Sequence, residues 1–262
     1  MLRFSLWITL ILMVLPVASE EVDGYVPPTF TVGVQDFYYP PHSFIEEGRY
    51  AGFGRDVLDL FASHRGYRFV YVPQPYIRNV VDLLGGKIDF QYPDDSKWLV
   101  EMKLPHTIFY SNGIVGYMDG VNRNRADLGK PLEELKRMVM PIGWTAKDYE
   151  PLVTEGKLII NQVGSVQAVI AMVLKGRVDG AYLNADVVNY HFASMGREGD
   201  VAIDTTLPYS FGHFTLSSKK HPAIIEEFNA FLNEQADAVA SLKEKYHFKY
   251  DKEPSVQPFT VN

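Results

Sequence analysis

The sequence contains no cysteine among its 262 residues. This absence excludes disulfide bridges, thiolate metal sites, a cysteine nucleophile and a lipoprotein anchor. The chain also lacks a Gly-x-Ser-x-Gly elbow, a phosphate-cradling glycine loop and a dinucleotide-binding fingerprint, which argues against the enzyme classes that depend on them. The folded protein must therefore be held together by packing alone.

Metal-binding patterns and basic runs are scarce as well. The seven histidines form no pair at i,i+4 beside a carboxylate, so we expect no metal site, and we expect no cofactor. The formal net charge is −7, and without a basic run this disfavours nucleic acid or an anionic membrane as partner. With 47% hydrophobic residues, the chain is long enough for one sizeable core or two small ones.

Residues 1–19 have the pattern of a secretory signal peptide. Arg3 precedes an apolar run, residues 6–15, that is too short to span a bilayer. Pro16 ends this run, and Val17-Ala18-Ser19 offers small residues for cleavage. We expect cleavage after Ser19 and export to the periplasm; an uncleaved N-terminal anchor is the alternative. Cleavage would remove one arginine and no acidic residue, which leaves a formal net charge of −8.

After residue 28, strand-like and helix-like patterns alternate along the chain. This alternation predicts an α/β fold with a mostly parallel sheet. Residues 120–129 are polar and are expected to form a surface excursion. Strands are expected at 29–35, 68–73, 88–92, 113–118, 138–142, 157–161, 178–182 and 213–216. Helices are expected at 53–66, 76–84, 132–135, from Thr145, and at 166–175, 185–192, 222–233 and 236–246.

One segment occurs twice, ninety positions apart, around Gly86 and around Gly176. Each copy is the end of an apolar helix, a glycine that stops it, and a short strand. The strands end in polar groups, Asp94 in the first copy and Asn184 in the second. Because ligands bind at the carboxyl ends of strands in open α/β sheets, two such units facing one another predict a cleft between two lobes. We expect residues 27–112 and 217–262 in one lobe and 113–216, with the crossing segments, in the other.

A longer series of short motifs runs through nearly the whole exported chain. It comprises Val32-Gly33-Val34, Tyr39-Pro40-Pro41, Gly52-Phe53, Asp56, Val72-Pro73, Gly86-Lys87-Ile88-Asp89, Gly143-Trp144-Thr145-Ala146, Gly176-Arg177-Val178-Asp179, Tyr209 and Gly212. No single motif is specific, but the ordered series resembles the extracellular solute-binding proteins of family 3, the amino-acid class. The resemblance implies a periplasmic-binding-protein fold of type II, with two α/β lobes, a two-segment hinge and the ligand cleft between the lobes.

The resemblance also implies a function and a partner. Such a protein captures a small polar solute, an amino acid or a related amine or carboxylate, and delivers it to an inner-membrane ABC permease. We expect a monomer without catalytic residues. Two alternatives remain open: a sensor that presents its solute-bound form to a membrane receptor, and a dehydratase like cyclohexadienyl dehydratase, whose acid would be Asp94, Asp95 or Glu101.

Four positions take ligand-binding roles by resemblance. Tyr39 matches the aromatic residue that stacks on the ligand, and Tyr76 matches a second position that often holds an aromatic residue. Ser96 lies near the hydroxyl that contacts the ligand carboxylate. Thr145, at an expected helix start, matches the second-lobe hydroxyl for that carboxylate, and the anion preference of helix N-termini gives the physical reason.

Two positions depart from the family pattern. The family's carboxylate-binding arginine is missing from residues 96–101, and neither Lys97 nor Arg78 lies at the matching place. The aspartate that takes the α-ammonium group is replaced by Asn184. A standard α-amino acid is therefore not assured as the ligand.

The residues themselves suggest further contacts, each with a plain structural alternative. Asp94 and Asp95, with Asn184, would suit a positive group on the ligand, or else serve as turn and N-cap residues. Trp144 would form a wall of the site or pack under a helix. Tyr209 would line the cleft or pack in the hinge. For Arg78 the alternatives are the ligand carboxylate and a surface or interlobe ion pair.

Overall fold

The computed structural model describes residues 26–253; the predicted signal peptide lies outside them. The strands are β1 Thr29–Gln35, β2 Phe44–Glu46, β3 Arg49–Ala51, β4 Arg68–Gln74, β5 Phe90–Asp94, β6 Phe109–Tyr110, β7 Val115–Asn124, β8 Arg137–Pro141, β9 Ile159–Val163, β10 Gly180–Asn184, β11 Val201–Ile203 and β12 Tyr209–Ser218. The helices are α1 Phe53–Arg65, α2 Tyr76–Leu84, α3 Val100–Lys103, α4 Glu150–Thr154, α5 Val166–Leu174, α6 Ala185–Ser194, α7 Pro222–Glu234 and α8 Ala236–Lys245, with 3-10 turns at Arg125–Asp127, Leu132–Glu134 and Lys147–Tyr149.

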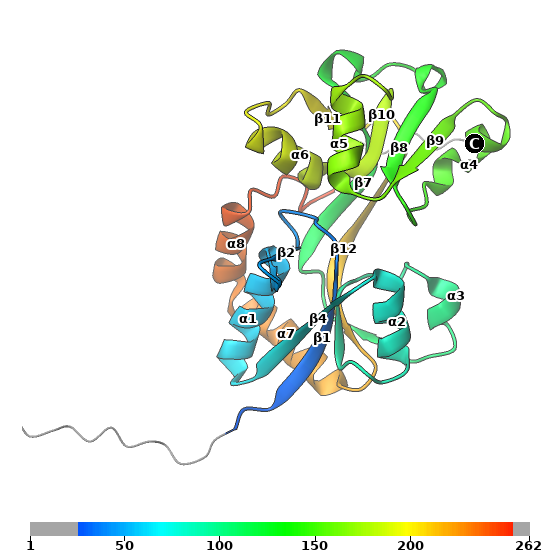
Figure 1. Ribbon diagram of the computed structural model, residues 1–262. Helices are drawn as coiled ribbons and strands as arrows, with labels where there is room; N and C mark the ends of the chain where they lie inside the picture. Colours follow the sequence, from blue (N-terminus) through cyan, green and yellow to red (C-terminus); the bar gives the residue numbers. More distant parts are fainter. Residues whose placement is uncertain (1–25, 254–262) are drawn as a thin grey trace, which may run out of the picture.

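Two α/β lobes lie one above the other (Figure 1). The first lobe contains the strand order β4-β1-β5-β12, with α1, α2, α7 and α8 packed around it. The second lobe contains β7-β10-β8-β9, with α5 and α6 against it. β1, β4 and β5 are parallel, as are β8, β9 and β10, because a helix returns the chain between them. No helix among the described residues is long and apolar enough to cross a membrane.

Two long strands connect the lobes. β7 and β12 pair antiparallel from Val115 opposite Phe214 to Gly120 opposite Tyr209. Beyond that shared stretch, β12 continues along β5 and β6 in the first lobe, whereas β7 continues along β10 and β11 in the second. The hinge is therefore a two-stranded ribbon in which β12 continues into the sheet of the first lobe and β7 into the sheet of the second.

The duplicated segment has the same geometry in both lobes. Gly86 and Gly176 take left-handed φ values of 72° and 60° just after α2 and α5, the conformation that ends a helix most readily at glycine. In both copies a backbone N–H of the next residue reaches back five residues, from Lys87 to Asp82 and from Arg177 to Met172. β5 and β10 then begin, both two residues later than the sequence predicts.

Two expectations were wrong. Residues 120–123 are not part of a surface excursion, because β7 runs on to Asn124 and Arg123 is only 2% exposed, paired with the equally buried Asp204. Residues 124–129 are mostly exposed, as expected. The helix expected from Thr145 is a 3-10 turn at Lys147–Tyr149 followed by α4. Pro151 explains the later start of α4, since proline fits only the first turn of a helix.

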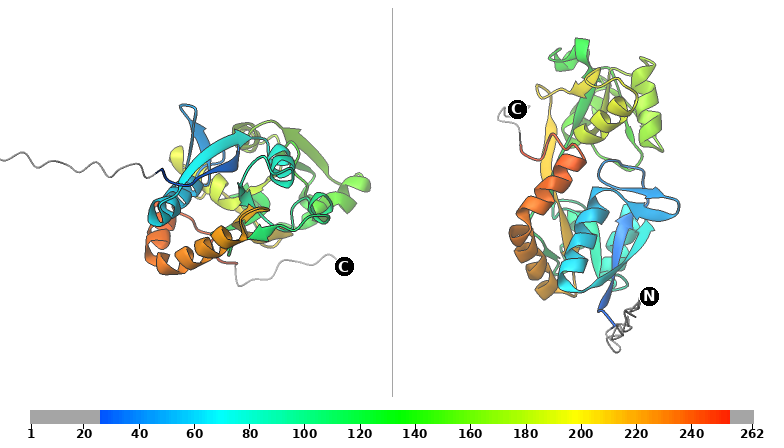
Figure 2. Two further views of the ribbon diagram at one scale, coloured as in Figure 1. Left: turned by 90° about the horizontal axis from the view of Figure 1, so that it is seen from below. Right: turned by 90° about the vertical axis from the view of Figure 1, so that its left-hand side faces the viewer.

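The segment that follows α8 joins the two lobes a third time, which the sequence did not predict. Figure 2 shows the chain rising from α8 toward the second lobe. The backbone N–H groups of Lys249 and Tyr250 donate to the carboxylate of Asp186 in α6, at 2.9 and 3.4 Å. The Phe248 ring meanwhile packs against Phe53 in the first lobe. This segment ties α6 to α1 along the back of the hinge.

Replacing Arg123 by methionine should strongly destabilise the protein. The substitution leaves Asp204 buried without its cation, which costs about 3–5 kcal/mol. Arg137→Met is the matched control, because Arg137 pairs with Asp179 at half exposure, 3.3 Å away, and such a pair is worth about 0–1 kcal/mol. Urea unfolding of both variants measures the difference in their loss of stability. Equal losses would show that the buried Arg123–Asp204 pair contributes no more than the exposed Arg137–Asp179 pair.

Candidate functional site

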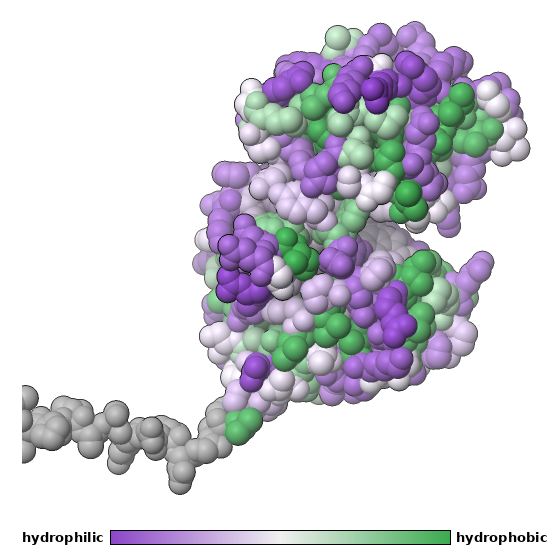
Figure 3. Space-filling view, viewed as in Figure 1, coloured by the Kyte–Doolittle hydropathy of each residue, from purple (hydrophilic) through white to green (hydrophobic). Residues whose placement is uncertain are grey.

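The candidate site lies where the two lobes face each other. β1, β5, β8 and β10 all point their carboxyl ends toward this interface, so the polar residues and loops that follow them meet there. Figure 3 shows the molecule hollowed between the lobes on the side of α2, α3 and α4. The polypeptide thus forms a cleft whose back wall is the β7–β12 ribbon.

Aromatic rings cover the ribbon at this level. Tyr117 of β7 and Phe214 of β12 stack with ring centroids 5.0 Å apart, and Trp98 packs against both, at 5.5 and 5.8 Å. The Tyr117 ring crosses the strand over Gly212, where an added Cβ would lie 2.5 Å from the tyrosine oxygen. The hydroxyl of Tyr117 donates to Asp95 at 2.9 Å. Asp95 therefore fixes the ring of the hinge tyrosine to the first lobe.

The lobes also touch through the loop that follows β1. Tyr39 in this loop lies against Trp144 of the second lobe, with centroids 5.9 Å apart, and stacks on His42 at 5.6 Å. His42 Nε2 lies 3.4 Å from Asn184 Oδ1 in the second lobe. Burial lowers the pKa of His42 to about 3, so the imidazole is neutral at physiological pH.

Asp94 is a structural residue in this arrangement. Its carboxylate is fully buried and pairs with Lys103 at 2.6 Å. It also accepts hydrogen bonds from the Tyr76 hydroxyl, at 2.8 Å, and the Ser217 hydroxyl, at 2.7 Å. Both oxygens of Asp94 therefore accept hydrogen bonds within the protein. We no longer propose Asp94, or the Tyr76 hydroxyl that donates to it, as a ligand contact. No sequence motif marks Lys103 as a partner of Asp94, so the Lys103–Asp94 ion pair was not predicted.

Asn184 has a similar structural role in the second lobe. Its side chain is fully buried and caps α6, because Oδ1 accepts the backbone N–H groups of Asp186 and Val187, at 3.0 and 3.2 Å. Its Nδ2 donates to Asp119 Oδ1 at 3.2 Å. Asn184 therefore positions Asp119 instead of offering its own amide to a solute.

Two of the other predicted residues have structural partners. Arg78 turns along α2 to Asp82, 3.0 Å away, and forms the surface ion pair that was its alternative role. Tyr209 packs in a small apolar cluster with Met118, on the face of the sheet away from Tyr117. Its role is therefore packing at the hinge.

The remaining predicted residues are Trp144, Ser96 and Thr145. Trp144 is partly buried, whereas Ser96 and Thr145 are exposed. Trp144 comes from the second lobe and already touches Tyr39 of the first. It is therefore the predicted wall residue that the structure brings to the interface.

Asp119 is the residue that the sequence analysis missed. It lies in the shared ribbon, directly opposite Asn184 on β10 and Ser210 on β12, and its side chain is partly buried. Burial raises the pKa of Asp119 to about 7, against a smaller lowering by the hydrogen bond from Asn184. The signal was a lone carboxylate within the otherwise uncharged first part of the strand, residues 115–121, two residues from Tyr117 and so on the same face.

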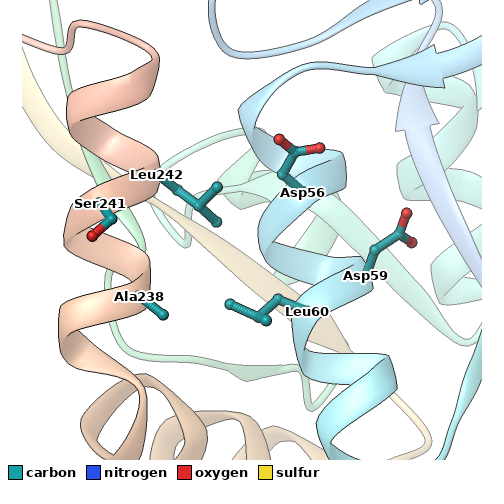
Figure 4. A pocket seen from close by; sticks show the side chains of 6 residues that line it. All are labelled: Asp56, Asp59, Leu60, Ala238, Ser241 and Leu242. Carbon is teal, nitrogen blue, oxygen red and sulfur yellow. The ribbon is translucent and has the colours of Figure 1, made fainter.

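A groove of about 440 Å³ lies elsewhere, between α1 and α8 on the first lobe. Figure 4 shows Asp56 and Asp59 at its α1 side and Leu242 at its α8 side. Both carboxylates already have partners, Asp56 with Lys245 and Asp59 with Arg55, each at 2.7 Å. The groove is shallow and lies apart from the cleft. Within residues 26–253, no group of three or more His, Asp or Glu side chains is arranged to hold a metal ion.

Comparison with solved structures identifies the fold. The periplasmic binding protein of Salmonella typhimurium described as having high arginine specificity aligns with a TM-score of 0.63 at 15% identity, over 84% of this chain and 100% of that one. An ancestral amino acid-binding protein, a precursor of cyclohexadienyl dehydratase, aligns at 0.63 and 20% identity, over 83% and 95%. The open form of substrate-binding domain 2 of Lactococcus lactis GlnP aligns at 0.59 and 15% identity, over 85% and 97%.

This chain has the fold of the type II periplasmic binding proteins. The fold class predicted from the sequence is thereby confirmed, with two α/β lobes, a two-stranded hinge and the cleft between them. No family model and no curated protein matches the sequence. Because identity to the solved structures is 15–20%, the residues in this cleft carry the argument about function.

Replacing Asp119 by asparagine should stabilise the ligand-free protein at pH 8. The pKa of the Asp119 carboxyl is higher in the folded protein than in the unfolded chain. Its contribution to the stability of the folded protein is therefore lost as the pH rises, here between about pH 4 and pH 7. At pH 8 the wild type has lost that contribution, on the order of 2–4 kcal/mol, and the amide has no charge to bury. Thermal unfolding from pH 4.5 to 8.5 should show a difference in Tm between the variant and the wild type that becomes smaller as the pH falls. A variant that is less stable than wild type at pH 8 would refute the raised pKa.

Proposed function

We propose that this protein is an exported solute-binding protein that captures a small polar solute between its lobes and delivers it to a membrane partner. The observation that carries the proposal is the interlobe cleft, beside which aromatic rings from both lobes and from the hinge pack together. A site divided in this way is complete only when the lobes are together. The sequence carries none of the nucleophile or cofactor motifs considered above that would suggest chemistry instead.

Solute binding would be coupled to lobe closure by simple thermodynamics. A solute that touches Tyr39 on the first lobe and Trp144 on the second gains more contacts in the closed form than in the open form. The population therefore shifts toward closure in proportion to that difference in affinity. The β7–β12 ribbon is the element that bends, since both lobes are built onto it.

The partner in this proposal is an inner-membrane ABC permease. Solved proteins of the same fold include the substrate-binding protein of an amino acid ABC transporter, and the predicted signal peptide supports action outside the cytoplasm. The solute in this proposal is an amino acid or a related amine or carboxylate. A sensor role would use the same cleft and the same closure, and loss of solute uptake in a strain that lacks the protein separates transport from signalling alone.

A dehydratase role is favoured by two observations and opposed by others. The fold is shared with a precursor of cyclohexadienyl dehydratase, and Asp119, with its pKa of about 7, has the property of a general acid. However, the acids first considered are unsuited: Asp94 is ion-paired and buried, Asp95 holds Tyr117, and Glu101 is exposed outside the ribbon. Binding alone remains the proposed function.

Thermal unfolding of the purified protein against a solute panel tests the proposal. The panel contains amino acids, polyamines, small carboxylates, sugars and prephenate. A true solute at about 100 times its Kd adds about 2.7 kcal/mol, which raises the Tm by several degrees in a protein of this size. Trp144→Ala should reduce the shift, whereas Leu128→Ala, at an exposed position of the second lobe, should leave it unchanged and serves as the control. If the protein converts prephenate to a product, the dehydratase function replaces the binding proposal.

A further inference from the structure

We propose that Asp119 selects the solute: its carboxylate holds the cationic nitrogen group of a bound amine or guanidine. This role rests on the proposed solute-binding function and narrows the solute to one chemical class. It also moves cation recognition from Asp94 and Asp95, where the sequence analysis placed it, to the hinge ribbon.

The carboxylate of Asp119 is held on one side and open on the other. Oδ1 accepts the hydrogen bond from Asn184 Nδ2, and Asn184 is itself fixed by two backbone N–H groups at the start of α6. From the part of the chain that the structure describes, no donor reaches Oδ2. An oriented carboxylate with one unused oxygen is suited to accept an N–H group from a ligand.

Asp119 differs in this respect from the two carboxylates that end β5. Both oxygens of Asp94 are occupied, by Lys103 and by hydroxyl groups. Both oxygens of Asp95 are occupied as well, by the Tyr117 hydroxyl and a backbone N–H group. Neither residue has an oxygen that is free of a hydrogen bond, in contrast to Asp119.

The buried carboxylates of the second lobe are likewise engaged. Asp186 accepts from the backbone after α8, and Asp204 accepts from Arg123 and from its own loop. A partly buried charge is costly without a partner. Of these carboxylates, Asp119 is the one with an oxygen that a ligand can still occupy.

The surroundings of Asp119 favour a cation and add no competing charge. The negative charge of Asp119 adds to the burial that raises the pKa of Tyr39 in the first lobe and of Tyr117 and Tyr182 in β7 and β10, and tyrosine rings are compatible with a cation nearby. Burial raises the pKa of each tyrosine above its ordinary value of 10, so all three stay neutral below pH 9. Ser210 on β12 carries no charge.

Two further titratable groups lie nearby. His42, beside Asn184, is neutral above about pH 3. Asp186, in the first turn of α6, has a pKa raised by burial to about 6 and therefore ionises in the same range as Asp119. Its carboxylate is engaged by the backbone of Lys249 and Tyr250, after α8, and not by the cleft.

The coupling to protons has a definite sign. In the empty protein Asp119 holds a proton below about pH 7, and a bound cation favours the ionised form and so displaces that proton. The cation therefore binds at full strength above pH 7 and loses affinity roughly tenfold per pH unit below it. A neutral or anionic solute would show no such loss.

Isothermal titration calorimetry at pH 8.5, 7.0 and 5.5 tests this role, with L-arginine, agmatine and putrescine as cationic probes and L-glutamate, citrate and glucose as comparisons. The cationic probes keep their charge over this range. We expect a cationic probe to bind wild type, to weaken at least tenfold between pH 7.0 and 5.5, and to weaken at least tenfold in Asp119→Asn at pH 8.5. The variant should also lose the pH dependence. Asp200→Asn, an exposed second-lobe carboxylate paired with Arg197, is the charge-matched control.

The outcomes separate the two proposals. Equal binding of a cationic probe to wild type and Asp119→Asn, or a preference for citrate or glucose, which carry no amine, overturns the role of Asp119 and leaves solute binding in place. Binding of no compound in this set or in the wider thermal panel overturns the proposed function and the role of Asp119 with it. Circular dichroism of Asp119→Asn confirms that a loss of affinity is not a loss of fold.

Discussion

The antiparallel pairing of β7 with β12 is the constraint on which the rest of the structure depends. Each strand leaves the pair to join a different sheet, so this one ribbon connects the two cores and also forms the back of the cleft. Its side chains must therefore serve packing, hinge and site together. Gly212 shows the consequence, because only a residue without Cβ leaves room for the Tyr117 ring to cross the strand.

Most of the fold was predictable because local signals and tertiary structure agree. The bounds of β1 and α2 match the expected ranges residue for residue, and the left-handed glycines after α2 and α5 occur where the duplicated segment places them. The failures have tertiary causes. Asn122 and Arg123 read as surface residues, but long-range partners bury them: Asn122 donates to Leu183 and Arg123 pairs with Asp204.

The candidate site was harder to predict for the same reason. A polar residue at the end of a strand can bind a ligand only if no neighbouring residue already forms hydrogen bonds or an ion pair with it. The sequence does not show which residues are neighbours in the fold. Lys103 occupies Asp94, and the backbone of α6 occupies Asn184. Asp119 was overlooked because its importance comes from register: it lies opposite Asn184, on a strand that crosses between lobes.

The register also explains why an amide at position 184 suits a carboxylate at position 119. Two carboxylates opposite one another on paired strands would repel each other at a partly buried site. With an amide at position 184, the pair is a hydrogen bond, and the carboxylate of the pair lies on the ribbon that connects the lobes. A cation held by Asp119 would therefore contact the hinge itself. Its binding would then be coupled directly to the relative position of the lobes through this one residue.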